Sequence, residues 1–87
     1  MKEAIRANVI AYIASFANLK IEDVMDEHIL KSYPLGLDDT KLGFLTIALR
    51  AYLRSINPDQ IVLASELRKK DFDVKKTYEL IIKKAGI

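Results

Sequence analysis

Apolar residues near the start of the chain recur at steps of three and four, which is the period of one face of an α-helix. The stripe consists of Ile5, Val9, Ile10, Ile13, Phe16 and Ala17. It predicts a helix from Glu3 to Ala17. Asn18 interrupts the pattern and can end this helix, because asparagine tolerates the left-handed conformation of a C-terminal cap.

The next segment has no helical period and predicts a long loop. It begins as an acidic stretch whose clearest apolar anchors are Val24 and Met25. Pro34 disfavours a helix in the residue before it, and Gly36 can complete a turn. We therefore expect an ordered connection between two helices.

A long apolar run follows and predicts a second helix. Asp38 or Asp39 can cap its start, since a carboxylate accepts hydrogen bonds from the free N–H groups of the first turn. Apolar residues then cover almost the whole circumference, and the polar positions are Lys41, Thr46, Arg50 and Arg54. Such a helix either lies at the centre of a bundle or exposes an apolar strip to a partner. We expect the central position.

Two shorter helices complete the pattern. Asn57 can cap the third, with Pro58 at the first helical position, and the helix is expected to end in the cations Arg68, Lys69 and Lys70. Asp73 can cap the fourth, and Gly86 can end it. The buried stripe of the fourth helix is expected to contain Val74, Tyr78, Ile81 and Ile82.

These elements predict a single all-α domain spanning residues 1–87, a four-helix bundle with a long loop between the first two helices and a short third helix. The composition agrees, because 51% of the residues are apolar and 30% are charged, as in a folded globular protein. There is no cysteine, which excludes disulfides, thiolate zinc sites and cysteine nucleophiles. We expect a cytoplasmic protein without a signal peptide or membrane association.

Charge is divided unevenly along the chain. Up to Thr40 there are four cations against seven acids, and from Lys41 onward ten cations against five acids, so the two parts carry −3 and +5. Such a division can steer a charged partner, although a solvated helical surface with lysine-rich ends has the same composition.

The residues required for most enzyme sites are missing. His28 is the only histidine, so neither a two-histidine metal site nor a serine–histidine couple can form. The acids Glu22, Asp23, Asp26 and Glu27 lack the spacing of a calcium loop. We expect no catalytic activity and no metal.

A cationic cluster raises the possibility of nucleic-acid binding. It consists of Arg68, Lys69, Lys70, Lys75 and Lys76. Two aspartates lie within the cluster, and no helix offers the arginine, asparagine and glutamine side chains that read base edges. Nucleic acid is therefore not the expected partner.

The segment from Leu35 to Leu45, LGLDDTKLGFL, resembles the start of the second helix of acyl carrier proteins, where the pattern is Leu-Gly-x-Asp-Ser-Leu. The resemblance includes the apolar first helix, the long acidic loop with Ile21 and Val24 in the places of its buried anchors, and the starts of the third and fourth helices. It covers roughly Ile5 to Lys84 and implies a bundle of the acyl-carrier-protein type. The resemblance also implies that the binding partner is an enzyme of acyl or polyketide biosynthesis.

The sequence departs from that family at the attachment site. In the family, the serine after the Leu-Gly-x-Asp run carries 4′-phosphopantetheine. Leu35, Gly36 and Asp38 match the run, but Asp39 occupies the place of the serine and has no hydroxyl to form the phosphodiester. Thr40 is one position late, which rotates its side chain by about 100° on a helix. We expect no prosthetic group, and 4′-phosphopantetheine only if the attachment motif is atypical.

The second departure is electrostatic. The family's second helix is acidic, whereas the helix here has three cations and no acid from Thr40 to Ser55. Complementarity then calls for an acidic docking patch on the partner. The predicted contact face consists of Asp38, Lys41, Phe44, Arg50 and Arg54, with Asp39 as a fixed negative charge or simply a helix cap.

Three hypotheses follow from these residues. The first is a monomeric docking module of acyl-carrier-protein type without the phosphopantetheine arm. The second is a genuine acyl carrier in fatty acid or polyketide biosynthesis with an atypical attachment motif, and the third is a small helical adaptor or nucleic-acid-binding protein. If an acyl cavity is retained, its expected walls are Ile13, Leu45, Leu49, Ile61 and Tyr78.

Overall fold

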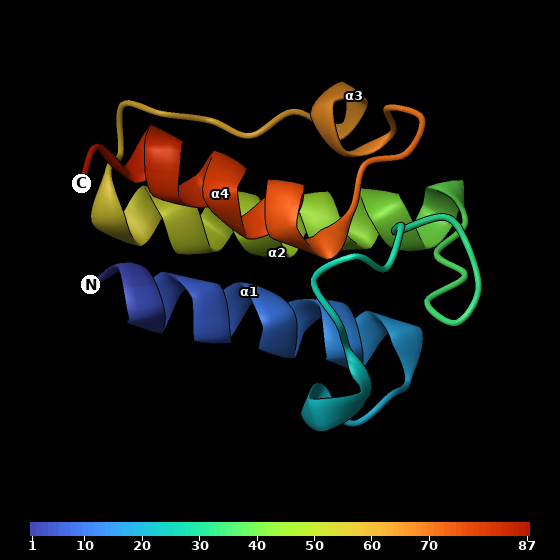
Figure 1. Ribbon diagram of the computed structural model, residues 1–87. Helices are drawn as coiled ribbons and strands as arrows, with labels where there is room; N and C mark the ends of the chain where they lie inside the picture. Colours follow the sequence, from blue (N-terminus) through green and yellow to red (C-terminus); the bar gives the residue numbers. More distant parts are fainter.

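The computed structural model describes all 87 residues and contains four α-helices and no strand. The helices are α1 (Lys2–Ala17), α2 (Asp39–Ile56), α3 (Ala64–Leu67) and α4 (Val74–Ala85), and a short 3₁₀ turn, η1, spans Ile21–Asp23. In Figure 1, α1, α2 and α4 lie side by side along the length of the molecule, and α3 is a single turn beside them. The all-helical prediction is confirmed.

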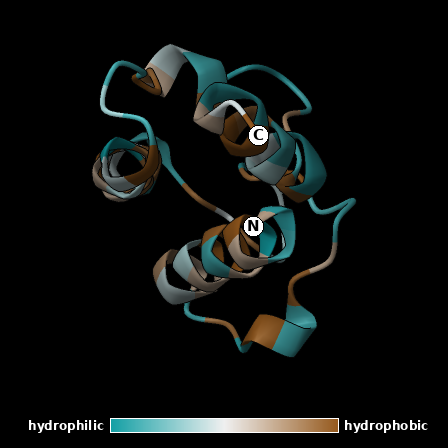
Figure 2. Cartoon of the chain, turned by 90° about the vertical axis from the view of Figure 1, so that its left-hand side faces the viewer, coloured by the Kyte–Doolittle hydropathy of each residue, from teal (hydrophilic) through white to brown (hydrophobic).

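The three long helices enclose one hydrophobic core. Figure 2 shows hydrophobic segments gathered toward the middle of the bundle, with hydrophilic segments outside. The core holds 18 buried apolar residues, and the loop between α1 and α2 supplies four of them. These four residues are Val24, Leu30, Leu35 and Leu37.

The predicted helix ends are confirmed at four positions. Asn18 and Gly86 end α1 and α4 in the left-handed conformation, with φ of 58° and 79°. Asp38 and Asp73 cap α2 and α4, and each carboxylate accepts a 2.8 Å hydrogen bond from the amide three residues later. Local sequence signals therefore set these boundaries.

The loop between α1 and α2 is ordered, as predicted, but two of its expected anchors are wrong. Val24 is buried, whereas Ile21 and Met25 are 55% and 45% exposed because the turn η1 lies on the surface. The loop is instead held by backbone pairing with the segment before α4. Leu30 N–H donates to the Phe72 carbonyl at 3.0 Å, within a short antiparallel bridge.

The predicted start of the third helix at Asn57 is wrong. Asn57 terminates α2, and its side-chain amide donates a 3.1 Å hydrogen bond to the Lys84 carbonyl at the end of α4. The chain then continues without helix to Leu63 because Val62 is drawn into the core. The asparagine therefore caps the C-terminus of one helix instead of the N-terminus of another.

Candidate functional site

The outward face of α2 carries exposed apolar residues. Phe44 and Ile47 are 53% and 61% exposed, and Ala51 continues the same stripe four residues later. The opposite face of the helix is fully buried in the core through Leu42, Leu45, Leu49 and Leu53. The helix is therefore central to the bundle, as expected, and also presents an apolar strip to solvent. We call Phe44, Ile47 and Ala51 the α2 strip.

The segment that connects α2 to α3 is held against α2 by Arg50. The Arg50 guanidinium donates to the Val62 carbonyl from Nε at 3.2 Å and from Nη2 at 3.1 Å. Val62 is buried, so its neighbours Ile61 and Leu63 project outward and are about half-exposed. Ile61 and Leu63 therefore add exposed apolar surface beside α2. The hydrogen bonds that hold their segment come from Arg50, which lies about one helical turn after Ile47.

The cations of α2 are not equivalent. Arg50 donates to the Val62 carbonyl and is partly buried, so it positions the connecting segment. Lys41 and Arg54 are exposed and take part in no ion pair. They lie thirteen residues apart, which is about 20 Å along the helix axis. The α2 strip is therefore flanked by a free positive charge near each end.

Both aspartates at the start of α2 contribute to its structure. Asp38 is the cap, and the Asp39 side chain is 79% exposed with its Oδ1 3.6 Å from Arg68 Nε. Arg68 Nη2 also donates to the Asp39 backbone carbonyl at 3.1 Å. Arg68 thus ties the first turn of α2 to the end of α3 and lies beside Gly43, where an added Cβ would be 3.7 Å from Nη2.

The residues predicted to form the contact face are only partly brought together. Lys41 and Phe44 lie within the first two turns of α2, and Arg54 lies in the last turn on the exposed side. Arg50 belongs to the internal contact with Val62. Ile47 was not among the predicted contact residues, although its spacing of three from Phe44 places it on the same face of the helix.

No apolar cavity joins the five expected wall residues of an acyl site. Ile13, Leu45 and Leu49 are fully buried and Tyr78 nearly so, within one close cluster, whereas Ile61 lies on the surface. The only pocket of the molecule is elsewhere, between α4 and the segment after α2, and a single apolar residue lines it. The structure therefore contains no cavity with these walls.

A second polar cluster joins α1, the long loop and α4. Tyr78 donates a 2.8 Å hydrogen bond from its hydroxyl to Asp26 Oδ2, and the Arg6 guanidinium lies 5.5 Å from the centre of the Tyr78 ring. Burial raises the pKa of Tyr78 above its ordinary value of 10.0. The pKa of Arg6 is also raised, first by the neighbouring Tyr78 and then by the Asp26 carboxylate. This cluster links elements across the bundle.

Neither metal ligands nor a membrane segment contribute a site. The structure has no group of three or more histidine, aspartate or glutamate side chains placed to hold a metal ion. No helix combines the length and the apolar character required to cross a bilayer.

Comparison with known proteins adds no match. No protein-family model, curated protein or solved structure is similar to this chain.

Proposed function

We propose that the protein is a non-enzymatic docking module that binds a partner helix across the outward face of α2. The observation that carries this proposal is the α2 strip, an exposed apolar stripe on an otherwise well-packed helix. Exposed apolar side chains grouped on one face are typical of interaction surfaces. The free cations Lys41 and Arg54 near its two ends define the charge of the partner.

The partner is an acidic amphipathic helix. A second copy of α2 fits this face less well than an acidic helix, because in-register packing in either direction places cation against cation. Acids spaced about 20 Å apart on a partner helix would meet Lys41 and Arg54. Apolar residues between those acids would cover Phe44 and Ile47, as in helix-in-groove recognition.

The resemblance to acyl carrier proteins supports this proposal. The order of four helices with a long first connection and a short third helix agrees with what the resemblance implies. Asp39 at the place of the modified serine offers no hydroxyl for the arm, and Arg68 already pairs with it. The module therefore acts through its surface and carries no phosphopantetheine.

A titration with a designed peptide tests the docking proposal. The probe is a helical peptide with glutamates thirteen residues apart and leucines between them, added to the ¹⁵N-labelled protein. We expect saturable shifts of the α2 amides around Phe44, Ile47 and Ala51. Lys41→Glu should weaken binding about tenfold, the effect expected when a contact charge is reversed.

The matched control is Lys76→Glu, which changes the net charge equally at an exposed position of α4. It should leave the affinity within about twofold of the unmodified protein, since surface charges separated by more than a Debye length are screened. Equal losses in Lys41→Glu and Lys76→Glu would show unspecific charge attraction instead of docking on α2.

The genuine carrier is the alternative function. Incubation with coenzyme A and a promiscuous phosphopantetheinyl transferase, followed by intact mass measurement, distinguishes the carrier from the arm-free docking module. We expect no added mass on the natural chain, while Asp39→Ser supplies the missing hydroxyl and provides the positive control. Modification of the natural chain would support the carrier and contradict the arm-free module.

A further inference from the structure

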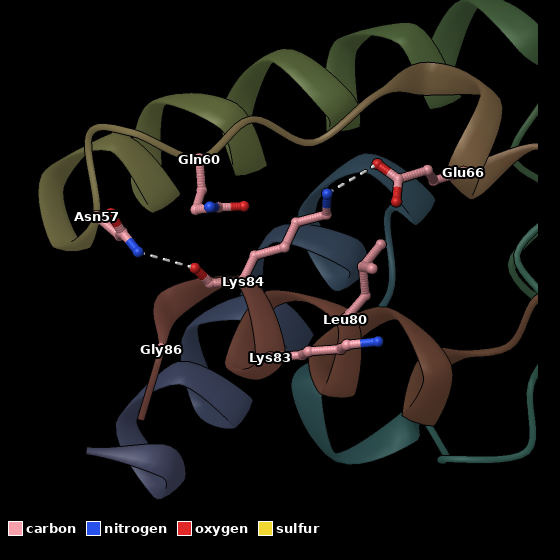
Figure 3. Close-up of a pocket in the computed structure, with 7 residues that line it drawn as sticks. All are labelled: Asn57, Gln60, Glu66, Leu80, Lys83, Lys84 and Gly86. Atoms are coloured by element: carbon pink, nitrogen blue, oxygen red, sulfur yellow. Dashed lines mark hydrogen bonds and ion pairs between the residues drawn. The ribbon is translucent and has the colours of Figure 1, made fainter.

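The pocket of the protein lies between the last two turns of α4 and the segment that connects α2 to α3. Its volume is about 350 Å³, which is room for roughly ten groups the size of a water molecule. Figure 3 shows the lining side chains arranged around this space. The residues are Asn57, Gln60, Glu66, Leu80, Lys83, Lys84 and Gly86.

One wall of the pocket is fixed by Lys84 and Glu66. Lys84 Nζ donates to the Ile61 carbonyl at 2.9 Å and lies 3.3 Å from Glu66 Oε1, and Figure 3 shows it reaching across to that carboxylate. The two side chains are only 20% and 22% exposed, which makes this the least exposed ion pair of the molecule. Glu66 Oε1 also accepts the Leu63 amide at 2.9 Å. The wall is therefore held by contacts within the protein.

Other polar groups of the pocket have no partner within the protein. The Lys83 ammonium takes part in no ion pair, and the Gln60 amide makes no side-chain hydrogen bond. Glu66 Oε2 takes part in neither of the contacts made by Oε1. The pocket thus offers a free cation, a free carboxylate oxygen and an amide that both donates and accepts.

The charges of the pocket have both signs. Lys83 and Lys84 supply two positive charges, Glu66 supplies one negative charge, and the C-terminus of α4 adds partial negative charge. A dianion such as a phosphate monoester would meet Glu66 and the helix end unfavourably. A purely apolar ligand would cover the Lys83 ammonium and the Gln60 amide without giving either of them a hydrogen-bond partner.

We propose that this pocket binds a small zwitterion of the free amino-acid class. Its carboxylate pairs with Lys83, its ammonium group pairs with Glu66 Oε2, and a polar side chain meets Gln60. The volume suits a molecule of about ten non-hydrogen atoms. This site is separate from the α2 strip, and the proposal does not depend on the docking function.

Titration of the ¹⁵N-labelled protein with L-glutamine tests the site. We expect saturable shifts confined to the amides of Gln60, Glu66, Lys83 and Gly86. Acetate and methylammonium each offer one of the two charged groups, so each should bind at least tenfold more weakly than glutamine.

Two variants locate the contacts. Lys83→Ala should weaken glutamine binding about tenfold, because one charge-assisted hydrogen bond is lost. Lys75→Ala, at an exposed lysine in the first turn of α4, should bind glutamine like the unmodified protein. Shifts that do not saturate, or equal binding by Lys83→Ala and the unmodified protein, would overturn the proposal.

Discussion

Single carboxylates fix the starts of two helices in this protein. Asp38 and Asp73 each accept a hydrogen bond from an otherwise free amide and place a negative charge at the positive end of a helix. Both roles could be predicted from the sequence, since aspartate directly before an apolar helical run has few other functions. The contact of Arg50 with the Val62 carbonyl could not be predicted, because the residues next to Arg50 in the sequence give no sign of it.

Removing either cap should cost about 1 kcal/mol of the free energy of unfolding. For a domain of this size, Asp38→Ala and Asp73→Ala should each lower the Tm by roughly 4–8 °C in a calorimetric scan. Asparagine at the same positions should retain most of the stability, because it also caps helices. An unchanged Tm in both alanine variants would contradict the capping role.

Tyr78 should make the stability sensitive to alkaline pH. Its pKa is raised in the folded state, so the protonated phenol stabilises the fold below pH 10.0, and this contribution is lost as the pH rises through the folded pKa. Tyr78→Phe should lose about 1 kcal/mol at neutral pH through the missing hydrogen bond to Asp26. The difference in unfolding free energy between the two proteins, measured by urea titration, should shrink above pH 10.0. If the difference in unfolding free energy stays constant above pH 10.0, the Tyr78 hydroxyl does not contribute in this way.

At the scale of elements, α2 combines two roles that the sequence pattern suggested as alternatives. One face supplies fully buried leucines to the core, and the other face leaves Phe44 and Ile47 in solvent. The nearly continuous apolar run predicted the helix well, but it could not show which side the other helices would cover. That depends on the placement of α1 and α4, which is set by contacts distant in sequence.

The third helix shows where local signals are ambiguous. Asparagine followed by proline is typical of a helix start, yet Asn57 bonds to the end of α4, 27 residues away in the sequence. The long loop shows the same limitation, because the buried Leu30 is held by a backbone hydrogen bond to Phe72, and Leu37 is held in turn by a backbone hydrogen bond to Leu30. Both outcomes depend on tertiary packing and could not be deduced from a short window of sequence.

The two faces of α2 should respond differently to truncation. Leu49→Ala removes a fully buried side chain and should cost about 2–5 kcal/mol, whereas Ile47→Ala should change stability by less than about 0.5 kcal/mol. Ile47→Ala should still weaken binding of the acidic peptide, since it removes apolar contact surface. Urea denaturation and the peptide titration measure the two effects separately. A large stability loss in Ile47→Ala would mean that this residue belongs to the core.

At the scale of the whole molecule, a small all-helical domain closes its core around three long helices and one anchored loop. A domain of this size has a net stability of roughly 4–13 kcal/mol. The core is complete without Phe44 and Ile47, so the fold does not need the exposed apolar face of α2 for its own packing. The fold class and most helix ends could be predicted from the sequence, whereas the extent of this face required the packed arrangement.

A charge-exchange titration tests the docking account most directly. The double variant Lys41→Glu with Arg54→Glu is compared with the unmodified protein, using the glutamate peptide and a matching peptide in which lysines replace the glutamates. We predict that the unmodified protein prefers the acidic peptide about tenfold or more and that the double variant reverses this preference. If both proteins bind the two peptides with the same preference, α2 is not the docking face.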